Sequence, residues 1–147
     1  QDFDWASIAA DPEGDHRPRT ELPEFLSKLK QTVTELARVG VQPVLMTLPP
    51  IDGARYLDYI CRGGLSRDSI MRWLGDVGCI YRHQELYSDT VASFAMREGL
   101  PLIDVRRRFL PQRDLSELIS ADGIHLTMPG YRQLFDTLAQ WVVPQLA

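Results

Sequence analysis

Long apolar runs and any excess of basic residues are absent from this sequence of 147 residues. No apolar run approaches the roughly 20 residues that a membrane-spanning helix needs, so we expect no membrane span. The net charge of -4 argues against a nucleic-acid partner, which would require a basic face. An apolar fraction of 44% and a charged fraction of 24% are those of an ordinary globular domain with a buried core.

Cysteine and histidine are also scarce. Cys61 and Cys79 lie far apart and neither belongs to a C-x-x-C pair, so we interpret them as inert core thiols rather than as a disulfide or a nucleophile. The three histidines share no ligand spacing, and no cysteine or carboxylate cluster completes a tetrahedral site. The sequence therefore predicts no metal and no cofactor.

Helical periodicity and short apolar runs alternate along the chain. Residues 1–19 are expected to form a loop, and helices are expected over 20–40, 54–62, 68–75, 80–98 and 127–142, with a helical turn at 115–119. The runs 43–48 and 101–105 are nearly continuous in apolar residues, which is typical of strands buried on both faces of a parallel sheet. The order predicts an α/β fold with long crossovers.

The ends of the first and last long helices carry recognisable signals. Thr20 is a plausible N-cap and Gly40 a plausible C-terminal stop for the first. Thr127 is expected to cap the last helix, with Pro129 in its first turn. That last helix is expected to bury six side chains: Tyr131, Leu134, Phe135, Leu138, Trp141 and Val142.

Two strands are too few for the sheet that such apolar strands indicate. Alone, the strand at 44–48 would present an unpaired apolar edge, which favours aggregation or association. We therefore expect further strands, supplied by an upstream segment or by another chain. The alternative is that further strands lie unrecognised in the stretches interpreted as loops.

Chemistry is concentrated in one segment, Asp122-Gly123-Ile124-His125, directly before the last helix. An aspartate three residues before a histidine can fold its carboxylate back onto the imidazole, hold the tautomer with a proton on Nδ1 and leave Nε2 to accept a proton. Gly123 gives the loop the backbone freedom for this short reach. The segment follows the last strand, where open α/β sheets bind ligands. The plainer alternative is a surface histidine that shares a loop hydrogen bond with Asp122.

The same segment resembles the last conserved block of the SGNH/GDSL hydrolases, which supplies the catalytic aspartate and histidine of that family. Stretches similar to a bacterial lipase/acylhydrolase branch run through nearly the whole chain, at 1–5, 43–52, 73–76, 80–82, 87–88 and 102–106. By this resemblance residues 1–147 are the C-terminal part of a single domain that begins just after the family's oxyanion asparagine. In the alternative register, Gln1-Asp2 stands in for the Asn-Asp of that block.

The resemblance implies a flavodoxin-like three-layer α/β/α sandwich with a parallel sheet, whose N-terminal strands are missing from this chain. It also implies an ester hydrolase in which a serine from a Gly-Asp-Ser block attacks the carbonyl. No Gly-Asp-Ser occurs here, and the nearest triplet, Arg67-Asp68-Ser69, sits at a helix start, where it is better interpreted as a cap. The chain alone therefore lacks the nucleophile and is expected to be inactive.

Other residues are weaker candidates. His16, Tyr56 and Trp73 are candidate substrate-binding residues, because His16 precedes the first helix and the two aromatics follow the proline turn that ends a strand. Tyr59 and Tyr81 share that segment, and ordinary packing is the alternative for each aromatic. His83 is interpreted as a helix-surface or packing residue. The run Arg106-Arg107-Arg108 is interpreted as solvated charge rather than as an anion site.

Two functions follow from these patterns. The first is an acylhydrolase or esterase with a Ser-His-Asp triad, in which His125 is the general base and Asp122 orients it, acting on a small-molecule or acylated ester. The second is a non-catalytic α/β binding or assembly module that keeps the Asp-x-x-His loop for structural reasons. No signal peptide is visible in the sequence, which favours a cytoplasmic location, but this absence says little if the true N-terminus lies upstream of Gln1.

Overall fold

The computed structural model describes residues 3–145, so Gln1 and Asp2, and with them the alternative register, lie outside the described part. Two short strands and seven α-helices are found there, with two single 3-10 turns. The α-helices and strands are α1 (Trp5–Ala10), α2 (Leu22–Arg38), β1 (Leu45–Met46), α3 (Gly53–Cys61), α4 (Arg67–Leu74), α5 (Gly78–Glu98), β2 (Leu102–Ile103), α6 (Arg106–Phe109) and α7 (Met128–Val142). The 3-10 turns are Leu115–Glu117 and Val143–Gln145.

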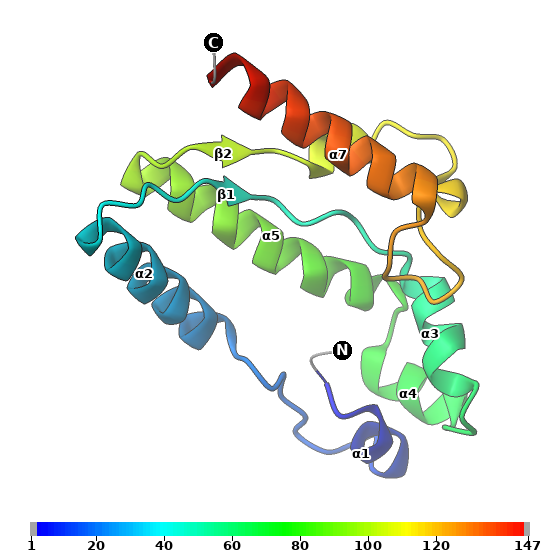
Figure 1. The fold of residues 1–147 in the computed structure, drawn as a ribbon. Coiled ribbons are helices and arrows are strands. Elements are labelled where there is room, and N and C mark those ends of the chain that lie inside the picture. The colour runs from blue at the N-terminus through cyan, green and yellow to red at the C-terminus, as the bar shows by residue number, and fades with distance from the viewer. Residues whose placement is uncertain (1–2, 146–147) are drawn as a thin grey trace.

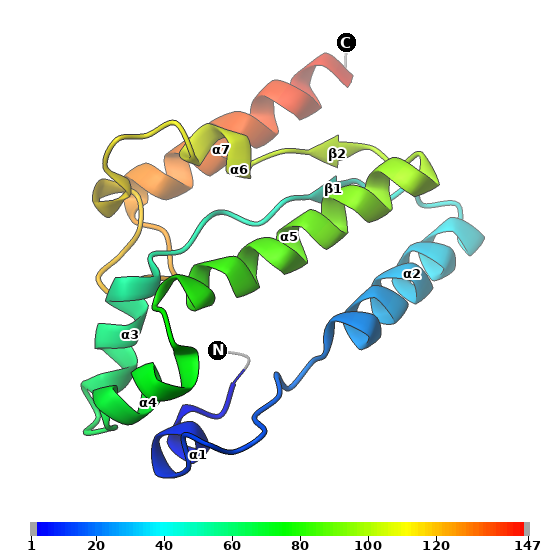
Figure 2. The same cartoon turned by 180° about the vertical axis from the view of Figure 1, so that it is seen from behind.

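The strands pair in parallel between two helical layers. Leu45 lies opposite Leu102 and Met46 opposite Ile103. The strand pair runs between α7 on one side and α5 with α2 on the other (Figures 1 and 2). The α-helical connection between parallel neighbours is the βαβ pattern that the sequence predicts. The mixed α/β fold is thereby confirmed. None of the described helices is both long enough and apolar enough to cross a membrane.

The buried side chains form two separate clusters. One joins α1, α3, α4 and the start of α5, and it is built on Ile8, Tyr56, Leu57, Ile70 and Ile80. The other joins β2, α6, the loop before α7 and α7 itself, and it is built on Ile103, Val105, Phe109, Ile119 and Leu126. The segment that carries Asp122 and His125 runs between the two clusters, because Ile124 packs on the first and Leu126 belongs to the second.

The expectation of a loop over residues 1–19 is wrong for α1. The Asp4 carboxylate accepts a hydrogen bond from the Ser7 amide and caps this helix, and Ile8 is fully buried beneath it. Six residues are too few to show helical periodicity, so the cap and one apolar residue were the only local signals. The N-cap predicted at Thr20 is also wrong, because α2 begins one residue later, after Glu21.

Both strands are shorter than predicted, and β1 is not buried on both faces. Val44 is exposed, and Leu45 and Met46 are only half-buried. The cause is that, within residues 3–145, β1 has β2 as its one strand partner, so its second edge has no backbone partner. Beyond β1, the Thr47 amide still donates to the Ile103 carbonyl of β2 at 3.1 Å, whereas the Leu48 amide donates to the buried Ser88 hydroxyl of α5.

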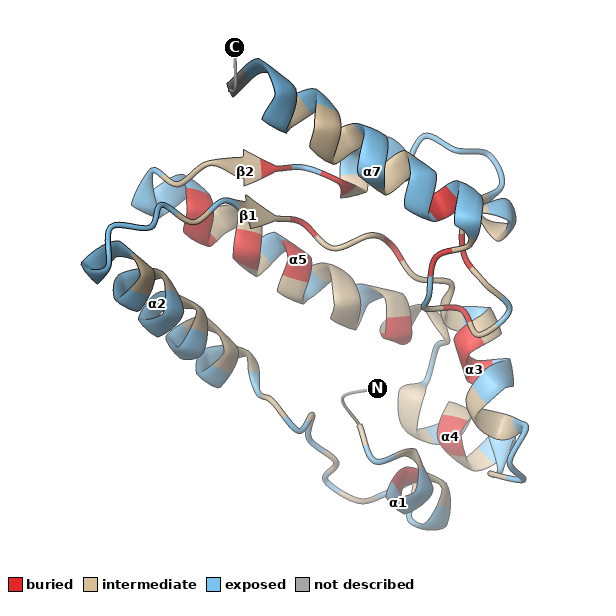
Figure 3. Cartoon of the chain, viewed as in Figure 1, coloured by how far each residue is buried: buried red, intermediate tan, exposed pale blue. Residues whose placement is uncertain are grey.

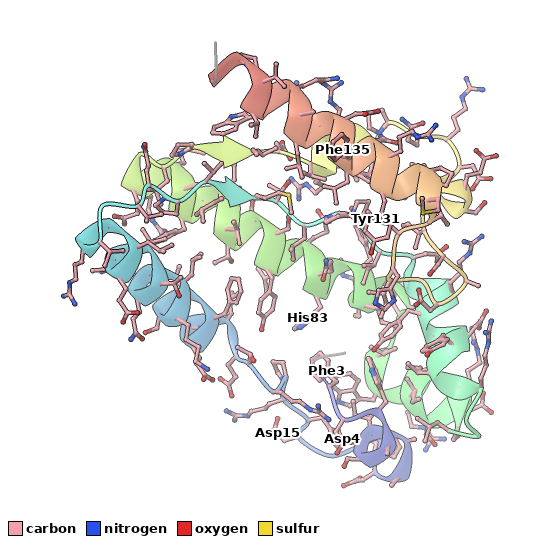
Figure 4. All side chains as sticks on the ribbon, in the orientation of Figure 1. Phe3, Asp4, Asp15, His83, Tyr131 and Phe135 are labelled. Carbon is pink, nitrogen blue, oxygen red and sulfur yellow. The ribbon has the colours of Figure 1, made fainter. Side chains whose placement is uncertain are left out.

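Helix α7 begins as predicted but buries fewer side chains. The Thr127 hydroxyl accepts from the Gly130 amide, and Leu134, Leu138 and Trp141 pack on the second cluster. Tyr131, Phe135 and Val142 were expected to be buried too, but they are exposed by 49%, 69% and 40%. Tyr131 and Phe135 lie on the side of α7 that faces the viewer in Figure 4, and much of that side is coloured as exposed in Figure 3. The six apolar residues form one stripe about 120° wide, and the strand pair covers only part of so wide a stripe.

Candidate active site

The Asp122 carboxylate and the His125 imidazole face each other at hydrogen-bond distance. Asp122 Oδ2 lies 2.6 Å from His125 Nδ1. The other oxygen, Oδ1, accepts from the backbone amides of Ile124 and His125 at 2.9 and 3.0 Å. The carboxylate therefore holds the imidazole and its own loop together, and favours the tautomer with hydrogen on Nδ1.

A third partner completes the surroundings of the carboxylate. The Ser120 hydroxyl donates to Asp122 Oδ1 at 2.5 Å. Burial alone would raise the pKa of Asp122, but the hydrogen bonds from Ser120, from the two amides and from His125 outweigh it and hold that pKa well below its usual range. Asp122 is consequently an anion at any pH near neutrality and can stabilise a positive charge on the imidazole.

This depressed pKa predicts a pH-dependent contribution to stability. The contribution of ionised Asp122 is fully present above the pKa of an unfolded aspartate, about 3.9, and is lost as the pH falls through the lowered folded pKa. Thermal melts of the wild type and of Asp122→Asn should therefore differ most near pH 7, with the gap narrowing only below about pH 4. A gap that stays constant down to pH 2.5 would mean that the carboxylate is not specially stabilised.

The loop is closed on itself by backbone bonds. The Ser120 amide donates to the His125 carbonyl at 2.8 Å, and Ile119 and Leu126 form an antiparallel bridge. Directly after the loop, Thr127 continues the closure with a bond from its amide to the Leu118 carbonyl. The position of the imidazole is thus fixed from both sides of His125.

Residues at the N-terminus of α3 hydrogen-bond to the same loop. The Asp52 amide donates to the Gly123 carbonyl at 2.8 Å, and the Arg55 guanidinium donates to the Ile119 carbonyl at 2.8 Å. Gly123 has φ +80°, and a Cβ there would lie 2.4 Å from the Tyr56 nitrogen and 2.5 Å from the Asp52 oxygen. Both the backbone angle and the close approach require glycine. Because α3 follows β1, this contact places the Asp122–His125 loop beside the segment that leaves the carboxyl end of β1.

The imidazole is open to solvent while its partner is sheltered. The side chain of His125 is 64% exposed and that of Asp122 is 21% exposed. An oriented, accessible imidazole can accept a proton from a hydroxyl brought to it and return the proton to a leaving group. Ser120 does not offer that hydroxyl, because its Oγ is engaged with the carboxylate. The triplet Arg67-Asp68-Ser69 does not supply the hydroxyl either, because it forms the first turn of α4. Its interpretation as the cap is wrong, since the residue that caps α4 is Ser66.

An apolar cavity of about 660 Å³ lies next to this loop, between α1, α3, α4 and α5. Aromatic and aliphatic side chains form most of its wall, among them Phe3, Trp5, Tyr56, Trp73, Tyr87 and Ile124. The structure thus brings two of the candidate substrate-binding residues, Tyr56 and Trp73, to one cavity beside the loop. Their role stays a prediction. Tyr56 is 3% exposed, so it offers the cavity only a small part of its ring.

The remaining candidates lie elsewhere. His16 lines a shallower hollow that adjoins the cavity through Phe3, Trp73, His83 and Tyr87. Its ring stacks edge-on with Trp73 at 5.9 Å, and its Nε2 lies 2.6 Å from the Asp11 carbonyl. Tyr59 is half-exposed on α3 and does not line the cavity, and neither does Tyr81.

Sequence reasoning missed part of the cavity wall. His83 is a packing residue, one of the two interpretations offered for it, because its ring contacts Phe3 and Tyr87, each at 4.9 Å between centroids. The part that the sequence did not indicate is that His83 also lines the cavity. The available signal was helical spacing, because Ile80, His83 and Tyr87 recur on one face of α5. The interpretation of Arg106 as solvated is wrong as well, because its guanidinium pairs with a largely buried Glu85.

The described residues offer no obvious metal site. Within residues 3–145, no three side chains of histidine, cysteine, aspartate or glutamate gather closely enough to hold a metal ion. Cys61 and Cys79 are free and half-buried rather than fully buried, and Cys61 packs on the first cluster. Burial raises the pKa of the Cys61 thiol, and Cys79 donates to the Leu74 carbonyl.

Comparisons with known proteins support the fold of this chain and nothing beyond the fold. No protein-family model matches this chain, and no curated protein matches it. Among solved structures it is similar to a lipase/acylhydrolase from Enterococcus faecalis, with a TM-score of 0.58 and 19% sequence identity. The match covers 94% of this chain and 58% of the other. The chain therefore shares its α/β fold with a lipase/acylhydrolase and spans somewhat more than half the length of that protein.

Proposed function

We propose that this chain supplies the acid–base half of a serine ester hydrolase. His125 is the general base that takes the proton of a serine hydroxyl and then the general acid that protonates the departing alcohol. Asp122 orients the imidazole and stabilises its charged form. The single observation that carries the proposal is the 2.6 Å contact between Asp122 Oδ2 and His125 Nδ1 on a loop that leaves the imidazole exposed.

The reaction would proceed through an acyl-enzyme. The serine oxygen bonds to the ester carbonyl carbon while its proton moves to His125 Nε2. The tetrahedral adduct collapses, the bond to the alcohol oxygen breaks and that oxygen takes the proton from Nε2. Water then repeats the two steps on the acyl-serine and releases the acid. In each step Asp122 stays ionised, in keeping with its lowered pKa.

The serine is proposed to come from a segment outside residues 1–147 or from another chain. Three features support this. The Ser120 hydroxyl, which contacts the pair, donates to the Asp122 carboxylate and not to the imidazole. Among the described residues β1 is paired on one edge alone. The similar lipase/acylhydrolase is longer, since this chain covers 58% of it. We propose that this segment or chain also adds strands to the sheet, and that it covers the exposed side chains of Tyr131 and Phe135 on α7.

Labelling with a fluorophosphonate tests the proposal directly. This reagent forms a stable bond with a serine that a neighbouring base has activated. The protein is expressed from its complete gene, labelled and digested, and the labelled peptide is identified. We expect one labelled serine outside residues 1–147, and loss of labelling in His125→Gln but not in Met128→Ala, a matched change at an exposed position three residues along.

Other outcomes decide against the proposal. A labelled serine within residues 1–147 would contradict the origin that we assign to the nucleophile. No labelling, together with no turnover of p-nitrophenyl acetate, would favour the non-catalytic module, in which Asp122 and His125 merely stabilise the loop before α7.

A further inference from the structure

Arg55, in the first turn of α3, is held by the Asp52 carboxylate at two of its nitrogen atoms. Asp52 Oδ1 accepts from the Arg55 amide at 3.0 Å, and this bond is also the N-cap of α3. Asp52 Oδ2 lies 3.5 Å from Arg55 Nε. Both side chains are largely sheltered, with 34% of Arg55 and 30% of Asp52 exposed. The direction of the Arg55 side chain is therefore fixed from the start of the helix.

The guanidinium at the end of this side chain contacts the chain that leads to Asp122. Arg55 Nη1 donates to the Ile119 carbonyl at 2.8 Å and to the Ser116 carbonyl at 3.2 Å. Hydrogen bonds from a charged group are stronger than those between neutral groups, and the planar guanidinium fixes their geometry. Because α3 follows β1, these bonds join the loop before α7 to the carboxyl end of that strand. Figures 1 and 2 show α3 beside this loop.

Ile119 is bonded, directly or through its neighbour, to both members of the proposed pair. It is fully buried and forms an antiparallel bridge with Leu126, the residue after His125. The next residue, Ser120, donates through its hydroxyl to Asp122 and through its amide to the His125 carbonyl. A shift of Ile119 would therefore move the carboxylate and the imidazole together.

The contact between Asp122 and His125 does not by itself place the imidazole relative to a nucleophile. Both partners lie within one short loop, so their contact can persist wherever that loop lies. The proposed serine comes from outside residues 1–147 or from another chain, so its meeting with the imidazole depends on where the loop rests on the domain. Arg55 does not line the cavity of about 660 Å³, and its Nη1 is engaged with carbonyls, so we assign it no contact with substrate.

We propose that Arg55 is a positioning residue of this site, which holds the Asp122–His125 loop on α3 so that the imidazole can reach the serine. This rests on the proposed function. A misplacement of about 1 Å between reacting groups can cost about a hundredfold in rate. Loss of the Arg55 guanidinium should therefore lower kcat, and it should leave KM nearly unchanged because Arg55 does not hold the substrate.

Chemical rescue tests this role in the complete gene product. Arg55→Ala should lower kcat for p-nitrophenyl acetate about 10- to 100-fold, with KM within about twofold of the wild type. Millimolar guanidinium chloride should restore most of the lost kcat, because the ion can occupy the space that the side chain leaves, whereas sodium chloride should not. Arg55→Lys keeps the charge but lacks the planar fork, so it should have an intermediate kcat that guanidinium does not improve.

Two control variants separate positioning from stability. Ile70→Val removes a methyl group from the buried cluster that joins α1, α3 and α4, so it should lower Tm and leave kcat unchanged. Arg67→Ala removes a partly exposed arginine that pairs with Asp58 of α3, and its kcat should stay at the wild-type value with or without guanidinium.

Hydrogen exchange tests the position of the loop without turnover. In Arg55→Ala the amides of residues 116–127 should exchange about tenfold faster or more, because the bonds that hold Ile119 are lost. Guanidinium should slow this exchange again. Ile70→Val should not speed exchange in this segment more than in the rest of the domain.

The outcomes separate this proposal from the proposed function. Exchange at the wild-type rate in Arg55→Ala would overturn the positioning role, whatever the activity. Faster exchange with an unchanged kcat, in a protein whose turnover is lost in His125→Gln, would also overturn it and leave the hydrolase standing. If the wild type neither hydrolyses the ester nor reacts with the fluorophosphonate, the hydrolase proposal fails, and faster exchange would then assign Arg55 to the stability of the loop alone.

Discussion

Replacing His125 by alanine is expected to lower kcat/KM for p-nitrophenyl acetate by about 10⁴-fold or more in the complete gene product. The imidazole is the group through which the serine proton leaves and the alcohol proton arrives, so its removal disables both halves of the reaction. The loss should appear in kcat rather than in KM, because the imidazole is proposed to act in the transition state and not to hold the substrate.

The structural contribution of His125 must be separated from its chemistry. His125→Gln keeps an amide that can donate to Asp122, so the loop retains a partner for its carboxylate, but an amide cannot act as a base. Both variants should lose activity, and His125→Gln should melt within a few degrees of the wild type. Met128→Ala, at a position 81% exposed, should keep full activity. Activity retained in His125→Gln would remove the base from the mechanism.

The sequence predicted the Asp122–His125 contact because both partners lie within one short loop. The spacing of three residues, the glycine between them and the Thr127 cap are local signals, and local geometry is what a sequence pattern specifies. The same reason explains the success with α3, α4, α5 and the start of α7. The triad role of the pair, and the serine that it would serve, stay predictions.

The missed features depend on contacts between distant parts of the chain. Gly123 was expected to supply backbone freedom, and φ +80° agrees, but its approach to the backbone of α3 joins residues about 70 positions apart and leaves no local pattern. The cavity likewise depends on Phe3 meeting Trp73 and His83. Tyr131 and Phe135 show the opposite error: apolar character predicted burial, although burial requires a neighbouring surface that the described residues do not provide.

Replacing Gly123 by alanine is expected to destabilise the protein by about 2–5 kcal/mol, through a positive φ that costs about 1–2 kcal/mol and a steric clash of about 1–3 kcal/mol. The clash is severe because the new Cβ would meet backbone atoms, the Tyr56 nitrogen at 2.4 Å and the Asp52 oxygen at 2.5 Å, rather than a side chain that can rotate away. Relief requires the loop to move off α3, which breaks the bond from the Asp52 amide to the Gly123 carbonyl.

A matched glycine isolates the steric part. Gly40 has nearly the same backbone angle, φ +76°, but a Cβ there meets nothing within 4 Å. Gly40→Ala should therefore cost only the conformational part, about 1–2 kcal/mol, in urea unfolding. Because the loop carries His125, Gly123→Ala should also lower ester turnover, whereas Gly40→Ala should not. Equal losses of stability in the two variants would mean that the loop does not rest on α3, and the support for the position of the imidazole would be gone.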